Sequence, residues 1–230
     1  MFKSILTSFL GVDESNIGIY MIHLARATER LEHIKHLEEQ LQAVLPIFDA
    51  ANGEELLKQG YPNDCPYTRG NKRGAGDVGC TVSHYNVSKD GLAKGYEFIV
   101  VFEDDCILNR ELEELRVYLE EVKKYFKDKT WDIFLLGNSA HLDFYPETNF
   151  LVKIRNFYGS HALILNRKAM ESIVDIHENG LKEYVVYSAD GIYVEAIKKL
   201  HLEAYGCIEA QYFFEQKAGI YSYILEGIRK

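Results

Sequence analysis

Three adjacent carboxylates, Glu103, Asp104 and Asp105, have the clearest potential for chemistry, and they directly follow the apolar run 98–102. Like charges this close raise one another's pKa unless a cation or strong hydrogen-bond donors compensate them. The triplet therefore either lies open to water as an acidic turn before a helix or holds a metal ion. Hard oxygen ligands suit Mg²⁺ or Mn²⁺, with phosphate oxygens completing the shell. Because side chains alternate along an extended chain, Glu103 and Asp105 should project to one side and Asp104 to the other.

Cations gather in the segment 69–76, where Arg69, Lys72 and Arg73 stand among three glycines. Glycines allow backbone amides to approach an anion, and a helix beginning at Asp77 would present its N-terminus there. The segment therefore predicts a phosphate site, with a solvated loop as the alternative. Taken with the carboxylates, it predicts one pocket for a metal and a diphosphate.

Strand-like apolar runs alternate with helix-period segments, which is the pattern of an α/β domain with a mixed, largely parallel central sheet flanked by helices. In such sheets ligands bind beyond the carboxyl ends of the strands, and the triplet follows one of them. Asn52, Asn109 and Ser188 are expected to cap helices. Strands are expected at 17–24, 44–48, 98–102, 132–136 and 161–165, and helices at 28–41, from 52, from 77, from 109, at 167–177 and at 188–200.

The first 16 residues form an amphipathic extension, and residues 17–230 are expected to form a single domain. Apolar residues of the extension fall on one helical face, which would either dock on the domain or lie at a membrane surface. Lys3 is the only nearby cation, which argues against the membrane. No apolar run approaches the ~18 residues needed to span a bilayer. We therefore expect a soluble, cytoplasmic protein, with peripheral contact at the inner membrane as the alternative.

The composition of the chain restricts the kinds of molecule that it is expected to bind. The 35 acidic and 26 basic residues give a formal net charge of −9, which argues against a nucleic-acid surface. With 47% hydrophobic residues, the 230-residue chain can bury a large core. The four cysteines are far apart and form no C-x-x-C pair, so their spacing indicates reduced thiols and suggests neither disulfides nor zinc.

Four blocks together resemble a glycosyltransferase family that builds bacterial lipooligosaccharide and includes collagen galactosyltransferase domains, glycosyltransferase family 25. They are IGIYMIHLARATERLEHI (17–34), FDAANGEEL (48–56), GDVGCTVSH (76–84) and FIVVFEDDCIL (98–108). Segments 159–170 and 188–197 are also similar, so the resemblance covers roughly residues 17–225. The chain departs from the family pattern at His23, Ala25, Ala27 and Asn52.

This resemblance implies a GT-A type nucleotide-sugar-binding domain that moves a sugar, commonly galactose, from a UDP-sugar to a saccharide acceptor with inversion. The implied cofactor is Mn²⁺ or Mg²⁺, with Asp105 as its direct ligand, and the implied acceptor is a lipid-linked core oligosaccharide. The residues expected to bind the donor are Leu24, Arg30, Ala50, Asn52, Gly53, Gly79, Ser83, Glu103, Asp104 and His161, together with Lys72 and Arg73 of the basic segment.

Inverting transfer also needs a group that takes the proton of the acceptor hydroxyl. Asp190 is one candidate, because it falls in the first turn of the helix expected after Ser188; the alternative is that it only stabilises that turn. His84 and His161 are the others, and each could instead be a packed histidine.

Two other function classes use the same residues. A metal-dependent nucleotide-sugar hydrolase would position a water in place of the acceptor, and a binding module would perform no reaction. Release of UDP with and without an acceptor saccharide separates the three classes.

Overall fold

A computed structural model of the chain describes residues 1–65, 72–217, 221–222 and 227–228. An eight-stranded sheet forms its centre, in the order β2-β1-β3-β8-β5-β9-β7-β6. Its strands are β1 (Ile17–His23), β2 (Ile47–Asp49), β3 (Phe98–Glu103), β5 (Ile133–Gly137), β6 (Ala140–Pro146), β7 (Leu151–Tyr158), β8 (Ala162–Asn166) and β9 (Ala204–Cys207). Two small pairs accompany it, β4 (Cys106–Leu108) with β10 (Phe214–Gln216), and β11 (Tyr221–Ser222) with β12 (Gly227–Ile228).

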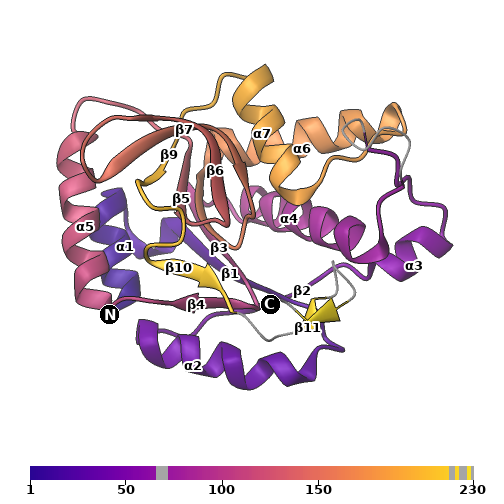
Figure 1. Ribbon diagram of the computed structural model, residues 1–230, viewed down its shortest axis with the longest axis horizontal. Coiled ribbons are helices and arrows are strands. Elements are labelled where there is room, and N and C mark those ends of the chain that lie inside the picture. Colours follow the sequence, from indigo (N-terminus) through magenta and orange to yellow (C-terminus); the bar gives the residue numbers. More distant parts are fainter. Residues whose placement is uncertain (66–71, 218–220, 223–226, 229–230) are drawn as a thin grey trace.

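Helices cover both faces of this sheet. They are α1 (Phe2–Leu10), α2 (Leu31–Leu41), α3 (Gly53–Lys58), α4 (Ala75–Ala93), α5 (Leu112–Tyr125), α6 (Arg167–Lys182) and α7 (Ala189–Lys199), with short 3₁₀ helices at Glu14–Asn16 and Thr28–Arg30. Figure 1 shows α1 and α5 side by side on one flank, and α4, α6 and α7 together on the other. The expected α/β fold with a mixed sheet and flanking helices is confirmed, but the sheet is not largely parallel, since three of its seven strand pairs are parallel.

The strands near the predicted site run parallel. Strand β1 pairs in parallel with β2 and β3, and β5 with β9, whereas the other four pairs are antiparallel. The register places Ile22 beside Glu103 and His23 beside Asp49. The carboxyl ends of three neighbouring strands therefore meet at one edge of the sheet.

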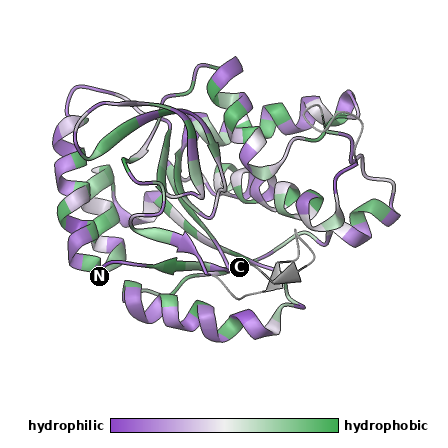
Figure 2. Ribbon diagram, in the orientation of Figure 1, coloured by the Kyte–Doolittle hydropathy of each residue, from purple (hydrophilic) through white to green (hydrophobic). Residues whose placement is uncertain are grey.

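Each face of the sheet has its own hydrophobic core. In β3, Val100 and Phe102 belong to the core under α1, α2 and α5, whereas Ile99 and Val101 belong to the core under α4, α6 and α7. A strand with both faces covered reads as a continuous apolar run, because alternating side chains all find apolar neighbours. Figure 2 shows this as hydrophobic central strands between helices of mixed polarity.

The apolar face of α1 is part of the first core, which confirms the expected docked helix. Phe2, Ile5, Leu6 and Phe9 are buried, and Phe9 stacks on Trp131 with ring centroids 5.7 Å apart. Protein therefore covers this face. Within the described residues, none of the helices combines the length and apolar composition that crossing a bilayer requires.

Two sequence expectations differ from the structure, and one hairpin is missing from the expected elements. The second strand begins at Ile47 and not at Val44, which is 73% exposed, because Pro46 has no amide proton to donate to a strand partner. Asn109 caps no helix: α5 begins at Leu112, and the Asn109 side chain donates to the Gln211 carbonyl. The hairpin β6–β7 was not predicted, since most of β6 is exposed and lacks an apolar run.

Candidate active site

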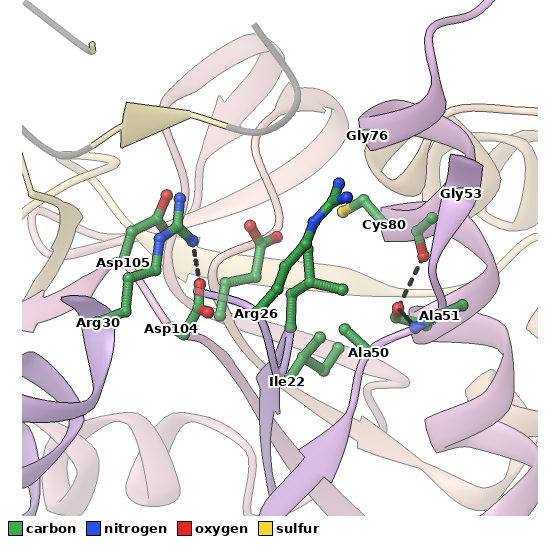
Figure 3. Close-up of a pocket in the computed structure, with 14 residues that line it drawn as sticks. Ile22, Arg26, Arg30, Ala50, Ala51, Gly53, Gly76, Cys80, Asp104 and Asp105 are labelled. Carbon is green, nitrogen blue, oxygen red and sulfur yellow. Dashed lines mark hydrogen bonds and ion pairs between the residues drawn. The ribbon is translucent and has the colours of Figure 1, made fainter. Parts of the chain in front are cut away.

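A narrow cavity of about 80 Å³ opens at the carboxyl edge of β1, β2 and β3 (Figure 3). The acidic triplet forms one wall, and the turn after β2 with the start of α4 forms the other. The cavity brings together nine residues that the sequence assigns to donor or metal binding: Leu24, Arg30, Ala50, Gly53, Gly79, Ser83, Glu103, Asp104 and Asp105.

The triplet is buried, so the expectation of an acidic turn open to water is wrong. Glu103, Asp104 and Asp105 are 9%, 5% and 2% exposed. Basic side chains compensate Asp104: Arg30 donates to Oδ1, and Nδ1 of His23 lies 2.7 Å from Oδ2. Burial would lower the pKa of Arg30, but the charges of the triplet outweigh burial and raise it. The sequence suggested that either water or a metal ion compensates the triplet, and neither alternative included basic side chains of the protein.

The three carboxylates also divide differently from the expected alternation. Figure 3 shows Asp104 and Asp105 beside the guanidinium of Arg30. Glu103 faces α4 instead, where its Oε1 lies 3.3 Å from Nε2 of His84 and accepts a hydrogen bond from Ser160 at 3.0 Å. Strict alternation fails because β3 ends at Glu103 and the next two residues form a turn.

His84 is fully buried behind Glu103. Its Nδ1 lies 2.8 Å from the hydroxyl of Tyr193, which is also buried. Burial alone would raise the pKa of Glu103, but the hydrogen bond and charge of His84, with His161 and Ser160, hold that pKa well below its usual range. Glu103 is therefore an ionised carboxylate at neutral pH.

Two glycines set the width of the opposite wall. A Cβ on Gly53 would lie 1.7 Å from the Ala75 carbonyl oxygen, and one on Gly79 would lie 2.6 Å from the Ala51 carbonyl oxygen. Ser83 of α4 also links the helix to this turn, because its hydroxyl accepts a hydrogen bond from the Ala51 amide at 2.9 Å. The turn after β2 thus sits directly on the first turns of α4, a contact that glycine alone permits.

A wide cleft of about 730 Å³ adjoins the narrow cavity, and Cys80 and Glu103 line both. Asp190 lies in the cleft, where its carboxylate accepts from the Gly159 amide at 3.2 Å. Its position after the capping residue Ser188 is as the sequence predicted. Burial raises the pKa of the Cys80 thiol well above its usual value.

The two described cations of the basic loop, Lys72 and Arg73, line the cleft and not the narrow cavity. The predicted single pocket is therefore two adjoining spaces. Arg73 is 4% exposed, forms an ion pair with Asp77 and donates to Thr81 at 2.9 Å, so it joins α4 to the chain before α7. Its guanidinium is committed to protein partners, which makes it a poor phosphate ligand here. Arg69 lies outside the described residues.

Two other donor-site candidates lie elsewhere. Asn52 caps α3 by accepting from the Glu54 amide, as its capping role predicts. His161 is fully buried and donates from Nε2 to the Phe214 carbonyl at 3.1 Å. Sequence reasoning missed Arg26, Cys80 and Ser160, although Arg26 and Cys80 stand inside the blocks that carry the family resemblance.

The narrow cavity suits a hard cation. Carboxylate oxygens are the donors that Mg²⁺ and Mn²⁺ prefer, and three carboxylates border this cavity. Asp104 is held by Arg30 and His23, and Glu103 by His84 and Ser160. Asp105 lines the same cavity and is the carboxylate that the family resemblance assigns to a metal.

The family of the chain follows from comparison with known proteins. The family model of glycosyltransferase family 25 (LPS biosynthesis protein) matches residues 16–225. The chain belongs to glycosyltransferase family 25. Strands β1, β2 and β3 and helix α4, which form the narrow cavity, all lie inside the matched range.

Curated relatives of this family 25 chain fall into two groups. The lipooligosaccharide biosynthesis protein lic2B of Haemophilus influenzae is 24% identical over 164 residues, covering 67% of this chain and 61% of that protein. A mouse inactive glycosyltransferase 25 family member 3 is 30% identical over 145 residues, and zebrafish procollagen galactosyltransferase 1 is 27% identical over 146. These two matches cover 56% and 57% of this chain but only 22% of either relative.

Proposed function

We propose that this chain is an inverting glycosyltransferase that moves a sugar from a UDP-sugar to a saccharide in lipooligosaccharide or lipopolysaccharide assembly. Galactose is the sugar that we propose first. The observation that supports this proposal is the meeting of two spaces at Cys80 and Glu103. One space carries the acidic triplet, and the other carries Asp190. A donor and an acceptor could thus approach each other from opposite sides. The proposed acceptor is a lipid-linked core oligosaccharide at the cytoplasmic face of the membrane.

The donor would enter the narrow cavity and extend into the cleft. Ligand pockets usually measure about 300–1,000 Å³, so the narrow cavity of about 80 Å³ can hold only part of a UDP-sugar. Arg26 lines this space with a half-exposed side chain and supplies positive charge for a nucleoside diphosphate, whereas Arg30 is committed to Asp104. Mn²⁺ or Mg²⁺ held through Asp105 would neutralise the diphosphate as it leaves.

Asp190 is the proposed general base. In the transfer, the acceptor hydroxyl oxygen forms a bond to the anomeric carbon on the face opposite the diphosphate. The bond from that carbon to the UDP oxygen breaks, UDP leaves with the electron pair, and the hydroxyl proton passes to the Asp190 carboxylate. His84 is fully buried behind Glu103, so we assign it a positioning role and not proton transfer. His161, buried and bonded to Phe214, is assigned no part in the reaction.

A non-catalytic binding module is the second candidate, because the mouse relative carries the name of an inactive family member. The two candidates share donor binding and differ only in turnover. A nucleotide-sugar hydrolase would turn over without an acceptor.

Release of UDP from UDP-galactose, measured in Mn²⁺ with and without acceptor saccharides, tests these proposals. A transferase releases UDP faster when acceptor is present. Acceptor-independent release would identify a hydrolase, and donor binding without any release would identify a binding module. Treatment with EDTA and the variant Asp105→Asn should each abolish transfer, and full activity after EDTA would exclude the metal.

A further inference from the structure

Cys80, His84 and Glu103 form a cluster of three different metal-binding side chains at the junction of the narrow cavity and the wide cleft. The thiol sulfur, an imidazole nitrogen and a carboxylate oxygen all lie within 4.8 Å of one another. Cys80 and His84 are four residues apart on α4, so they share one face of the helix. Glu103 meets them from the end of β3.

We propose that these three side chains bind a thiophilic divalent cation, Zn²⁺ in first place, with the fourth coordination position open to the cleft. Zn–N and Zn–O bonds of about 2.0–2.2 Å at a tetrahedral angle separate the two ligand atoms by about 3.3–3.5 Å. Nε2 of His84 and Oε1 of Glu103 are 3.3 Å apart. This separation is long for a charge-assisted hydrogen bond, which is usually about 2.7–2.9 Å. It matches the edge of a tetrahedral zinc site.

The surrounding hydroxyl groups suit a metal-bound imidazole. The Tyr193 hydroxyl lies 2.8 Å from Nδ1 of His84 and can either donate or accept. With a cation on Nε2, the imidazole proton would sit on Nδ1 and be donated to Tyr193, the arrangement that usually fixes a zinc-binding histidine. Ser160 donates to Glu103 and fixes its carboxylate. Binding therefore requires a change of proton position on His84, release of the Cys80 thiol proton to solvent and an approach of the Cys80 side chain, which lines both spaces.

This site is distinct in chemistry from the proposed hard-cation site at Asp105. A thiolate and an imidazole favour Zn²⁺ over Mg²⁺ and Mn²⁺, which prefer oxygen ligands. A cation at the junction would stand between donor and acceptor, so Zn²⁺ should inhibit transfer. That consequence rests on the proposed function, whereas the binding itself does not.

Titration of the reduced, EDTA-treated full chain with Co²⁺ tests the site directly. We expect about one equivalent of Co²⁺ to produce a near-ultraviolet thiolate charge-transfer band and visible bands of four-coordinate cobalt, and Zn²⁺ to remove both. Cys80→Ser should lose the charge-transfer band and at least ~10-fold in affinity. Cys65→Ser is the matched change at a half-buried cysteine outside the cluster, and it should keep both the charge-transfer band and the Co²⁺ affinity. Asp105→Asn should also keep the band and the affinity.

Absence of a thiolate band in the unaltered chain would overturn the proposal, and so would a band that survives in Cys80→Ser but disappears in Cys65→Ser. Cys80→Ala provides a second variant, and circular dichroism shows that each variant is folded. His84→Gln should weaken Co²⁺ binding while the thiolate band, at saturation, remains. If the chain gives the expected cobalt spectrum but releases no UDP in the transfer assay, the proposed function is contradicted and the proposed metal site is still supported.

Discussion

At the scale of single residues, burial of the acidic triplet explains why Arg30 and His23 lie where they do. Asp104 accepts from Arg30 and is hydrogen-bonded to His23, and all three side chains are buried. A carboxylate taken out of water costs several kcal/mol unless a paired charge and hydrogen bonds offset the loss of hydration. Arg30 therefore stabilises the fold as well as lining the cavity.

Replacing Arg30 by glutamine should lower the free energy of unfolding by about 3–5 kcal/mol, because the change leaves a buried carboxylate without its cation. Urea denaturation followed by circular dichroism measures the loss. Arg26→Gln is the matched control, since Arg26 lines the same cavity but pairs with Glu54 at the surface. Its stability should stay close to that of the unaltered chain. A loss below about 1 kcal/mol in Arg30→Gln would mean that other groups compensate Asp104.

Asp190→Asn should separate catalysis from donor binding. If Asp190 takes the hydroxyl proton, turnover should fall by ~10² to 10⁴ while UDP-sugar affinity stays the same. The fold should lose less than about 1 kcal/mol, because an asparagine oxygen can still accept from the Gly159 amide. Steady-state rates and calorimetric donor binding check both statements.

Ser188→Ala provides the control for this variant, because Ser188 caps the same helix by accepting from the Gly191 amide. Loss of the cap should cost about 1 kcal/mol with only a small change in turnover. Equal turnover losses in the two variants would mean that Asp190 acts only through the helix. A fall in donor affinity in Asp190→Asn would mean that Asp190 contacts the UDP-sugar donor.

At the scale of elements, the narrow cavity depends on how closely the turn after β2 approaches α4. Gly79→Ala should push these elements apart, because its Cβ would lie 2.6 Å from the backbone oxygen of Ala51. Such overpacking costs about 1–3 kcal/mol. UDP affinity should fall with it, since Ala51 and Gly79 both line the cavity. Thermal melting and UDP titration measure the two effects.

Gly74→Ala is the matched change one turn earlier in the chain. A Cβ there would meet nothing within 4 Å, and the φ of −68° suits any residue. Stability should change by less than about 1 kcal/mol, and UDP affinity should change less than in Gly79→Ala, because Gly74 does not line the narrow cavity. If Gly79→Ala behaves like Gly74→Ala, the close approach of the two elements is not required for UDP binding.

Local patterns explain which elements the sequence could predict. β1 and β3 are continuous apolar runs because both of their faces are covered, and Ser188 and Asn52 cap helices through bonds within a few residues. The position of the triplet at a strand end could be predicted for the same reason. Strand β6, which is mostly exposed, left no such pattern.

The internal contacts of the site could not be predicted, because they join residues distant in sequence. His23 and Asp104 are 81 positions apart, and Arg73 reaches a carbonyl 114 positions away. The spacing of Cys80 and His84 matches no zinc signature without Glu103, which the fold brings to them. The blocks that resemble the family therefore identified the residues of the narrow cavity but not its separation from the cleft.

At the scale of the whole molecule, one sheet separates two cores, and its central strands supply side chains to both. Ile99 and Val101 pack on the side of α6, while Val100 and Phe102 pack on the side of α1. Neither core can be lost without exposing the other face of the same strands. The two cores should therefore unfold together, even though helices from different parts of the chain cover them.

The variant Ile173→Ala tests this cooperativity. Ile173 is fully buried in α6, so its truncation should lower the free energy of unfolding by about 2–5 kcal/mol. Trp131, the only tryptophan, packs against Phe9 and Phe134 in the opposite core, and its fluorescence reports on that side. Because the sheet is shared, the urea midpoints of tryptophan fluorescence and of far-ultraviolet circular dichroism should fall by the same amount. Glu171→Ala, at an exposed position of α6, should move neither. An unchanged fluorescence midpoint beside an earlier dichroism transition would show that the α6 side unfolds independently.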